Sequence, residues 1–137
     1  MQALFSSCSD LISISFNEAF DTSKVQSMSE LFHDCHSLTS VNVSSFNTSS
    51  VMSFFQMFCL NDKLTSLDLS NFEAKYSCEF HDMFMSLKNL NFIDLSSFYS
   101  IYSSGCFLNL YNVKPNGTII ANNKLLIYSD NWAIINK

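Results

Sequence analysis

The sequence predicts an α/β solenoid of about four strand–corner–short-helix units, with a parallel sheet on its concave side. Three observations predict it. Apolar residues recur at intervals of 26 or 27 residues, each interval contains a stretch of alternating apolar and polar residues, and each contains apolar residues spaced three and four apart. Alternation is typical of a half-buried strand, and the wider spacing is typical of one helix face. The 137 residues are enough for one domain.

The repeat is clearest at phenylalanine. Four phenylalanines are separated by 27, 26 and 26 residues, namely Phe5, Phe32, Phe58 and Phe84. Six residues after each of them comes a leucine: Leu11, Leu38, Leu64 and Leu90. The extra residue of the first interval lies between Phe16 and Phe20, so we expect it in a loop. A fixed period of this length predicts stacked units that share one core, since a single unit of this size is not stable alone.

The alternating stretch of each unit predicts its strand. In LTSVNVS at residues 38–44 and LTSLDLS at residues 64–70, apolar residues occupy one face and small polar residues the other. The outward side chains are then expected to form a ladder across neighbouring strands. This ladder consists of Ser13, Ser15, Ser40, Asn42, Ser66, Asp68, Phe92 and Asp94.

The other half of each unit predicts a short helix. Met28, Leu31 and Phe32 have the spacing of a buried helical stripe, and Ser27 with Glu30 has the spacing of a capping box at the helix start. Strands in a sheet lie about 4.8 Å apart, whereas packed helices need about 8–10 Å. We therefore expect the stack to curve, with the strands on the inner surface.

A second line of phenylalanines follows the strands. It consists of Phe20, Phe46, Phe72 and Phe98. The L-x-x-L-x-L pattern before it is shared with leucine-rich repeats, which carry an asparagine or cysteine ladder at this point. The sequence thus predicts a leucine-rich-repeat-like solenoid whose spine is formed by stacked aromatic rings.

The chain divides into a solenoid at residues 1–110 and a capping segment at residues 111–137. KPNG at residues 114–117 is a turn signal, and residues 118–121 read as a strand. Beyond it, two readings remain open: a hairpin through Asn122 and Asn123 into residues 125–129, or a short helix from Lys124 that places Tyr128 and Trp132 on one face. No matching cap precedes Phe5, so we expect the N-terminal end of the solenoid to be uncapped.

Composition and motifs exclude several functions. The net charge of −5 argues against nucleic-acid binding, which needs a basic face. No apolar run reaches the roughly 18–20 residues that span a bilayer, and the first residues do not read as a secretory signal. Nucleophile elbows, glycine-rich phosphate loops and His-Glu-x-x-His are also missing. The sequence therefore predicts neither an enzyme nor a cofactor.

Cysteines and histidines offer the strongest hint of metal or redox chemistry. The five cysteines are odd in number and not closely paired, which argues against a disulfide framework. Cys8 and Cys35 occupy the same position in adjacent units and could be bridged, although buried free thiols are favoured. His33, Asp34, Cys35 and His36 supply donors of the kind that transition metals bind, but no second cluster completes the set. We therefore expect no metal site here.

Asp68 and Asp94 form the second candidate cluster. They share one position on neighbouring strands, so both are expected to point outward. Two carboxylates fall short of the six to eight oxygens that calcium takes. A solvated acidic face is the favoured interpretation.

The repeat resembles that of the BspA-like leucine-rich-repeat surface proteins. FDTSKVQSMSELFHDCHSLTSVNVSSFNTSSV and LTSLDLSNF follow the unit M-x-x-M-F-x-x-C-x-x-L-x-S-L-D-L-S-x-F-D-T-S-x-V, and the match covers about residues 1–109. The chain departs from the pattern at residues 73–77, which lack Thr-Ser-x-Val, and at Asn61 and Leu87, which replace the cysteine. The resemblance implies a cell-surface or secreted adhesion protein. The chain itself carries no export signal or anchor, so an intracellular location stays open.

We therefore expect a non-catalytic protein–protein interaction module that binds through the outward ladder of the sheet. Long faces of this kind are what solenoids use for partners, here a host, matrix or assembly protein. The alternative is a structural subunit of a larger intracellular assembly that docks or oligomerises through its uncapped N-terminal end. The simplest alternative is that the outward ladder only contacts solvent and binds no partner.

Overall fold

The computed structural model describes residues 1–73, 79–98, 108–110, 113, 116–121, 127–128 and 132–136 of the chain. This part of the chain contains short strands joined by turns and contains no helix. The strands are β1 (Ser13–Ser15), β2 (Ser40–Asn42), β3 (Ser66–Asp68), β4 (Phe92–Leu95), β5 (Leu108–Asn109), β6 (Thr118–Ala121), β7 (Ile127–Tyr128) and β8 (Ala133–Asn136).

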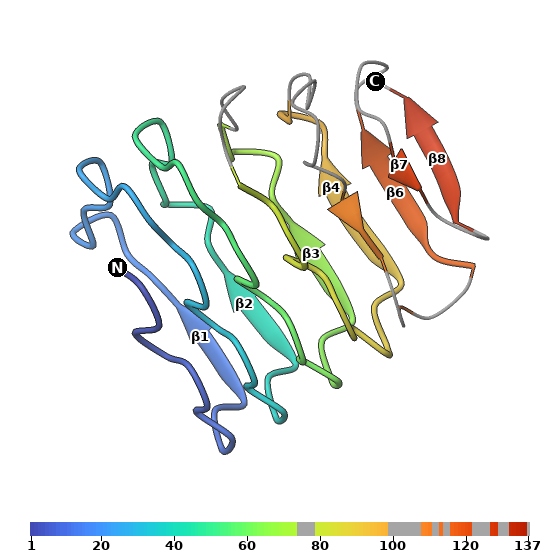
Figure 1. Ribbon diagram of the computed structural model, residues 1–137, viewed down its shortest axis with the longest axis horizontal. Helices are drawn as coiled ribbons and strands as arrows, with labels where there is room; N and C mark the ends of the chain where they lie inside the picture. The colour runs from blue at the N-terminus through green and yellow to red at the C-terminus, as the bar shows by residue number, and fades with distance from the viewer. Residues whose placement is uncertain are drawn as a thin grey trace.

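The strands stack as a parallel solenoid. β1 pairs with β2, and a second sheet has the order β3-β4-β6-β8, with every pair parallel. Figure 1 shows the successive turns side by side in a row from β1 to β8. Equivalent positions of the repeat meet in register, as in the pair Leu67 and Ile93. The 26-residue period therefore corresponds to one turn of the solenoid, and the predicted solenoid architecture is confirmed.

The predicted short helices are wrong. Met28, Leu31 and Phe32 lie in a run of consecutive turns, where the Leu31 N–H donates to the Met28 carbonyl at 3.2 Å. Helical continuation is broken by residues with positive φ, such as Glu30 at 56°. They recur at two positions of every unit: Ala3, Ser7, Glu30, Asp34, Gln56, Leu60, Asp82 and Ser86.

Alternate backbone N–H groups in these runs bond to the neighbouring turn. The N–H of Glu30 donates to the Phe55 carbonyl at 2.8 Å, and that of Phe32 donates to the Met57 carbonyl at 2.9 Å. The capping box is absent as well, because the Ser27 hydroxyl accepts the Ser29 N–H at 3.3 Å instead. A series of turns buries residues three and four apart much as a helix does. The spacing of apolar residues alone therefore did not distinguish a short helix from a series of turns.

This wall of turns, opposite the strands, also changes the expected shape. Isolated parallel bridges join Ser27 to Ser53 and Ser53 to Glu79 along it. This wall is thus linked by backbone hydrogen bonds from turn to turn, as the strand wall is except between β2 and β3. Strands bonded in this way lie about 4.8 Å apart. The predicted curvature rested on wider helix packing on one side, and that cause is missing from the described residues. The concave shape of the sheet stays a prediction, and we name the outward side of β1–β4 the strand face.

The core consists of stacked phenylalanine rings. Phe5, Phe32, Phe58 and Phe84 lie one above the next with centroids 5.5, 5.7 and 6.4 Å apart and ring planes within 11°. In the second line, centroids are 5.9 Å apart for Phe20 and Phe46 and 6.5 Å for Phe46 and Phe72. The predicted aromatic spine is confirmed, and such stacking adds about 0.5–1.5 kcal/mol per pair to the burial of the rings.

Buried threonines hold the corners that follow the strands. Thr22 donates its hydroxyl to the Asn47 carbonyl at 3.0 Å and accepts the Asn47 N–H at 2.8 Å. Thr48 makes the same two bonds with Glu73 of the next turn, at 3.3 and 2.7 Å. Each threonine is 1% exposed. The recurring Phe-[Asp/Asn]-Thr-Ser motif therefore encodes a hydrogen-bonded link between turns.

The C-terminal region continues the strand ladder. The strand predicted at residues 118–121 is present, and Ile119 pairs in register with Ile93, again 26 residues away. Both alternatives for the following residues are wrong in the part that the structure describes, because β7 is a strand that pairs parallel with β5, and β8 pairs parallel with β6. Residues 122–126 lie outside the described residues. The division of the chain at residue 110 stays a prediction.

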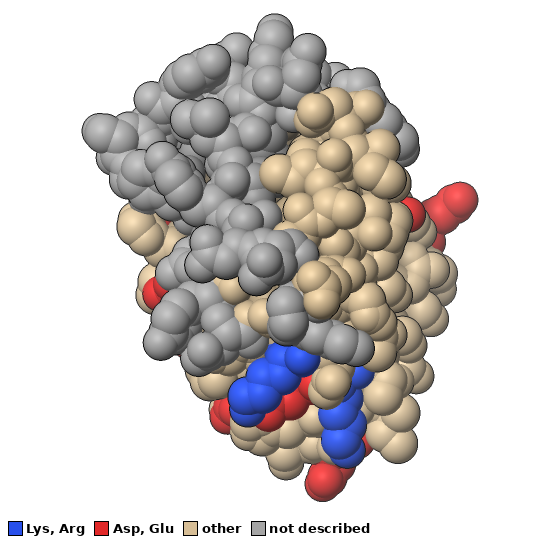
Figure 2. Space-filling model, turned by 90° about the vertical axis from the view of Figure 1, so that its right-hand side faces the viewer, with Lys and Arg blue, Asp and Glu red and all other residues tan. Residues whose placement is uncertain are grey.

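Trp132 packs against Gly117 where β6 and β8 begin. A Cβ at Gly117 would lie 2.6 Å from the Trp132 ring, so only glycine fits here without movement. The last strand, β8, lies at the sheet edge, and Ile134 is 45% exposed although its register partner Ile119 is buried. Figure 2 faces this end of the solenoid, where the described surface is mainly uncharged, the Lys side chains gather at the lower edge, and Asp and Glu side chains lie at the bottom and on both sides.

Candidate partner-binding face

The strand face carries the predicted ladder on three neighbouring turns. Six of its eight predicted residues are exposed, namely Ser13, Ser15, Ser40, Asn42, Ser66 and Asp68. The intervening Ile14 and Val41 are half-buried, and Leu67 is buried. Alternation along the strands therefore predicted this part of the face.

The fourth strand differs from the prediction. Phe92 is half-buried, and Asp94 is only 6% exposed instead of facing solvent. β4 is flanked by β3 and by β6, and the register neighbour of Asp94 on β6 is the half-buried Ile120. The expected register of Asp68 with Asp94 is observed. However, the two carboxylates do not form the solvated pair that the sequence predicts.

Side chains at the strand ends also have a structural role. The Oδ1 atom of Asn42 accepts the Ser44 N–H at 3.0 Å, and that of Asp68 accepts the Ser70 N–H at 3.0 Å. Asp94 accepts a backbone N–H two residues later in the same way. This Asx turn ends β2, β3 and β4, and asparagine and aspartate perform it equally. It accounts for the [Asn/Asp]-[Val/Leu]-Ser sequence of these three units, whereas the first unit has Ser-Phe-Asn at this point.

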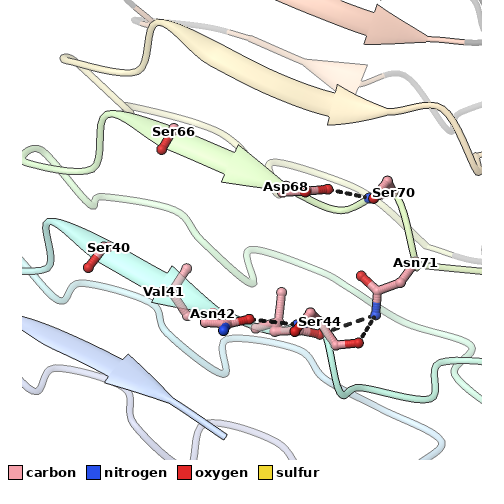
Figure 3. A pocket seen from close by; sticks show the side chains of 9 residues that line it. Ser40, Val41, Asn42, Ser44, Ser66, Asp68, Ser70 and Asn71 are labelled. Carbon is pink, nitrogen blue, oxygen red and sulfur yellow. Dashed lines mark hydrogen bonds between the residues drawn. The ribbon is translucent and has the colours of Figure 1, made fainter.

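A hollow of about 250 Å³ opens on the strand face between β2 and β3. Figure 3 shows polar side chains of both strands around it. Its lining is made of hydroxyls, amides, one carboxylate and two valines: Ser40, Val41, Asn42, Val43, Ser44, Ser66, Asp68, Ser70 and Asn71. Four of the predicted ladder residues thus line one hollow.

The hollow lies where the sheet is interrupted. β2 and β3 belong to different sheets, and no backbone hydrogen bond joins residues 38–46 to residues 64–72, all of which the structure describes. On the opposite wall, the same two turns remain bonded, for example by the Phe32 N–H to the Met57 carbonyl. We call this interruption the β2–β3 seam.

Asn71 closes one end of the seam. Its Nδ2 donates to the carbonyls of Val43, Ser44 and Phe46 at 3.2, 3.2 and 3.0 Å. Sequence reasoning missed Asn71, Ser44 and Ser70 as site residues. One signal for Asn71 was available in the sequence. The equivalent residue of the preceding unit is Ser45, so an amide side chain replaces a small hydroxyl at this repeat position. Ser45 also bonds to the preceding turn, by donating to the Phe16 carbonyl at 3.4 Å, but the amide of Asn71 reaches three carbonyls there.

The cluster at residues 33–36 does not assemble a metal site. Asp34 Oδ1 lies 2.7 Å from His36 Nε2, whereas the thiol of Cys35 is buried and donates to the Phe5 carbonyl at 3.0 Å. Burial raises the pKa of the Cys35 thiol to about 11. Among the residues that the structure describes, no three His, Cys, Asp or Glu side chains are placed to hold a metal ion.

The repeated cysteine position supplies a hydrogen-bond donor. Cys8 and Cys35 are free thiols, so no bridge joins these two turns. In the next unit the position is taken by Asn61, whose Nδ2 donates to the Phe32 carbonyl at 2.8 Å. Cys35 and Asn61 therefore both satisfy the carbonyl of a ladder phenylalanine one turn earlier, which explains why asparagine replaces cysteine. The role is structural.

Comparison with known proteins places the chain in a repeat family. Residues 1–103 match the family model described as "Mycoplasma protein of unknown function, DUF285". No curated protein matches the chain, and no solved structure matches it. The described part of the chain contains no helix long and apolar enough to cross a membrane. The match covers the strands β1–β4, the wall of turns and the β2–β3 seam, and the chain belongs to the DUF285 family.

Proposed function

We propose that this chain is a non-catalytic protein–protein interaction module that binds its partner through the strand face. The observation that carries the proposal is the row of exposed polar residues on three neighbouring turns, from Ser13 on β1 to Asp68 on β3. Solenoids commonly use such long faces for partners. The half-buried Phe92 at the end of the row adds one apolar contact.

The scaffold supports this role because it holds the face in place. Hydrogen bonds between turns run along the opposite wall, and the corner threonines Thr22 and Thr48 link the first three turns. A rigid face loses little conformational entropy on binding. Small polar side chains supply few strong contacts, so we expect modest affinity for each module.

The resemblance to BspA-like repeats supports an adhesion role at the cell surface or in secreted form. We include this location in the proposal, with a host or matrix protein as the partner. In the repeat unit of that family, the strand-forming Leu-x-Ser-Leu-Asp-Leu-Ser segment is the one that here supplies Ser66 and Asp68.

The test is a binding assay with purified matrix proteins and the whole chain. We expect at least one of them to bind, and we expect Ser40→Lys with Ser66→Lys to reduce that binding at least tenfold, because two long charged side chains would cover the face. Met52→Lys is the matched control, since Met52 is 55% exposed on the opposite wall next to Ser53. Equal binding by the two variants, or no binding by the wild type, would refute the proposal.

A second candidate is an assembly subunit that docks through its first turn. Phe5, Phe16 and Phe20 are half-buried, whereas Phe32 and Phe46 of the next turn are buried. Covering these rings with a second protein surface would complete their burial. We expect Leu4→Asp, at a side chain that is 55% exposed, to disperse such an assembly in sedimentation measurements. A wild-type chain that sediments as a monomer would refute this candidate.

A further inference from the structure

We propose that the two ends of the solenoid bind each other, so that β8 of one copy pairs in parallel with β1 of the next copy. The inference rests on the second candidate function, docking through the first turn, and names a second copy of this chain as the partner. Its basis is the exposure of core positions at both ends, the unprotected edges of the terminal strands, and a register that continues from one end to the other.

Exposed apolar side chains gather at the two ends. Four of the five large ones among the described residues lie in the first turn or on β8, and only Met52 lies between the ends. Leu4 is 55% exposed, although its equivalent one turn later, Leu31, is fully buried. Ile134 is 45% exposed, although its register partner Ile119 is fully buried. Leu4 and Ile134 therefore occupy core positions that lack a covering turn.

Backbone acceptors of the first turn also lack a partner. In the second turn, the Leu31 carbonyl accepts the Phe5 N–H at 3.0 Å, and the carbonyls two residues to either side accept N–H groups of the first turn in the same way. The equivalent carbonyls of the first turn accept no backbone N–H from the described residues, namely those of Gln2, Leu4 and Ser6. A surface that covers this end has to supply a row of N–H donors, and a further turn of the same solenoid does so.

Both terminal strands leave one edge unpaired. In the described part of the chain, β1 pairs only with β2 and β8 pairs only with β6, and Figure 1 shows β1 and β8 at opposite ends of the row. Natural sheets commonly protect such edges with charged residues or proline. Neither the Ser-Ile-Ser of β1 nor the Ala-Ile-Ile-Asn of β8 contains one. Pairing of the two edges therefore buries no charged side chain of either strand.

The register favours head-to-tail pairing over a symmetric dimer. Every strand pair of the described chain is parallel, and Ile134 continues the inward row of Ile93 and Ile119. Pairing β8 with β1 of the next copy extends this row to Ile14, which holds the same position in the first turn. A two-fold dimer through either end would cover only that kind of end. Because the two surfaces differ, each added copy leaves one end free, so growth continues.

The experiment is sedimentation velocity of the whole chain up to millimolar concentration. One turn offers a small contact surface, so we expect reversible species of the wild type that grow with concentration. Leu4→Asp blocks the first turn and Ile134→Asp blocks the β8 end, so each variant should sediment as a monomer. Met52→Asp is the matched control and should assemble like the wild type, because Met52 is 55% exposed, as Leu4 is, but lies between the ends.

Mixing the two monomeric variants is the decisive measurement. Leu4→Asp keeps its β8 end and Ile134→Asp keeps its first turn, so an equimolar mixture should form a dimer of one copy of each that does not grow further. Circular dichroism spectra and urea midpoints will verify that each variant is folded. Where an aspartate unfolds the chain, Leu4→Gln or Ile134→Gln takes its place.

Several results would overturn the inference. They are a wild-type chain that stays monomeric, dispersal by Met52→Asp, or a mixture of the two end variants that stays monomeric. Wild-type assembly by Ile134→Asp together with dispersal by Leu4→Asp sinks only the head-to-tail inference and leaves docking through the first turn. Matrix-protein binding by the monomeric variants tests the strand face separately, since neither substitution lies on it.

Discussion

Replacement of Phe58 by alanine tests whether the aromatic ladder holds the turns together. The ring is fully buried, and its neighbours Phe32 and Phe84 lie on both sides at 5.7 and 6.4 Å. Truncating a buried phenylalanine costs about 3–5 kcal/mol. We expect the upper half of this range, because two stacked neighbours lose a partner at once. A domain has only about 5–15 kcal/mol to lose.

Phe5→Ala is the internal comparison. Phe5 occupies the same position in the first turn, is half-buried, and stacks in its ladder on Phe32 at 5.5 Å. Its loss should cost roughly half as much as the loss of Phe58, since less area leaves water and one ladder contact is broken. Phe58→Leu retains apolar volume and removes the stacking, so we expect about 1–2 kcal/mol.

Urea denaturation followed by circular dichroism measures these differences. If Phe58→Ala proves unfolded in water, the leucine variant still reports the stacking contribution. Equal losses for Phe58→Ala and Phe5→Ala would refute the reasoning, as would a loss below about 2 kcal/mol for Phe58→Ala. Either result would mean that the turns do not depend on a continuous aromatic core.

Three further predictions concern a corner, the buried thiols and the C-terminal strands. Thr48→Val should lower the free energy of unfolding by about 1–3 kcal/mol, because it leaves the partly buried backbone N–H of Glu73 in the next turn unpaired. Burial raises the pKa of Cys35 and Cys59 from 9.0 to about 11. As the pH rises, the thiols therefore ionise first in the unfolded chain, so the free energy of unfolding should fall between about pH 9 and 11. Urea denaturation midpoints measured across this range will show the fall. Gly117→Ala should cost about 1–3 kcal/mol and shift the emission of Trp132, the single tryptophan, because the new methyl overlaps its ring.

Each of these predictions has its own control. Thr48→Ser keeps the hydroxyl and should retain most of the stability, so an equal loss in both variants would contradict the assigned bonds. A double Cys35→Ala and Cys59→Ala variant should lose stability less steeply with rising pH, and an unchanged slope would contradict the role of these thiols. Trp132→Leu should relieve the cost of Gly117→Ala, and an additive loss would show that the ring is not the obstacle.

Local pattern was sufficient for the features that repeat. The 26-residue period gave the register of the strands, because equivalent apolar residues must lie above one another to share a core. Leu67 and Ile93 meet in this way, and the same interval leads from Ile93 to Ile119. Alternation likewise predicted the exposed residues of β1–β3, since side-chain direction in a strand has a period of two.

Local pattern was insufficient wherever the partner of a backbone group lies in another turn. Residues with the spacing of Met28, Leu31 and Phe32 suit both a short helix and a series of turns. The outcome depends on whether the N–H of Phe32 finds its acceptor within its own turn or on Met57 of the next turn. Short helices gain little from their own bonds, so the bonds between turns prevail.

The sequence by itself determined which residues lie inside the solenoid, which lie on the strand face and how the phenylalanines stack, because these follow from a period that every unit repeats. Only the tertiary structure decided that Asp94 is buried, that a helix does not form, and that β2 and β3 part at a polar hollow. Burial and backbone pairing depend on what the neighbouring turn supplies. A repeat pattern read within one unit does not contain that information.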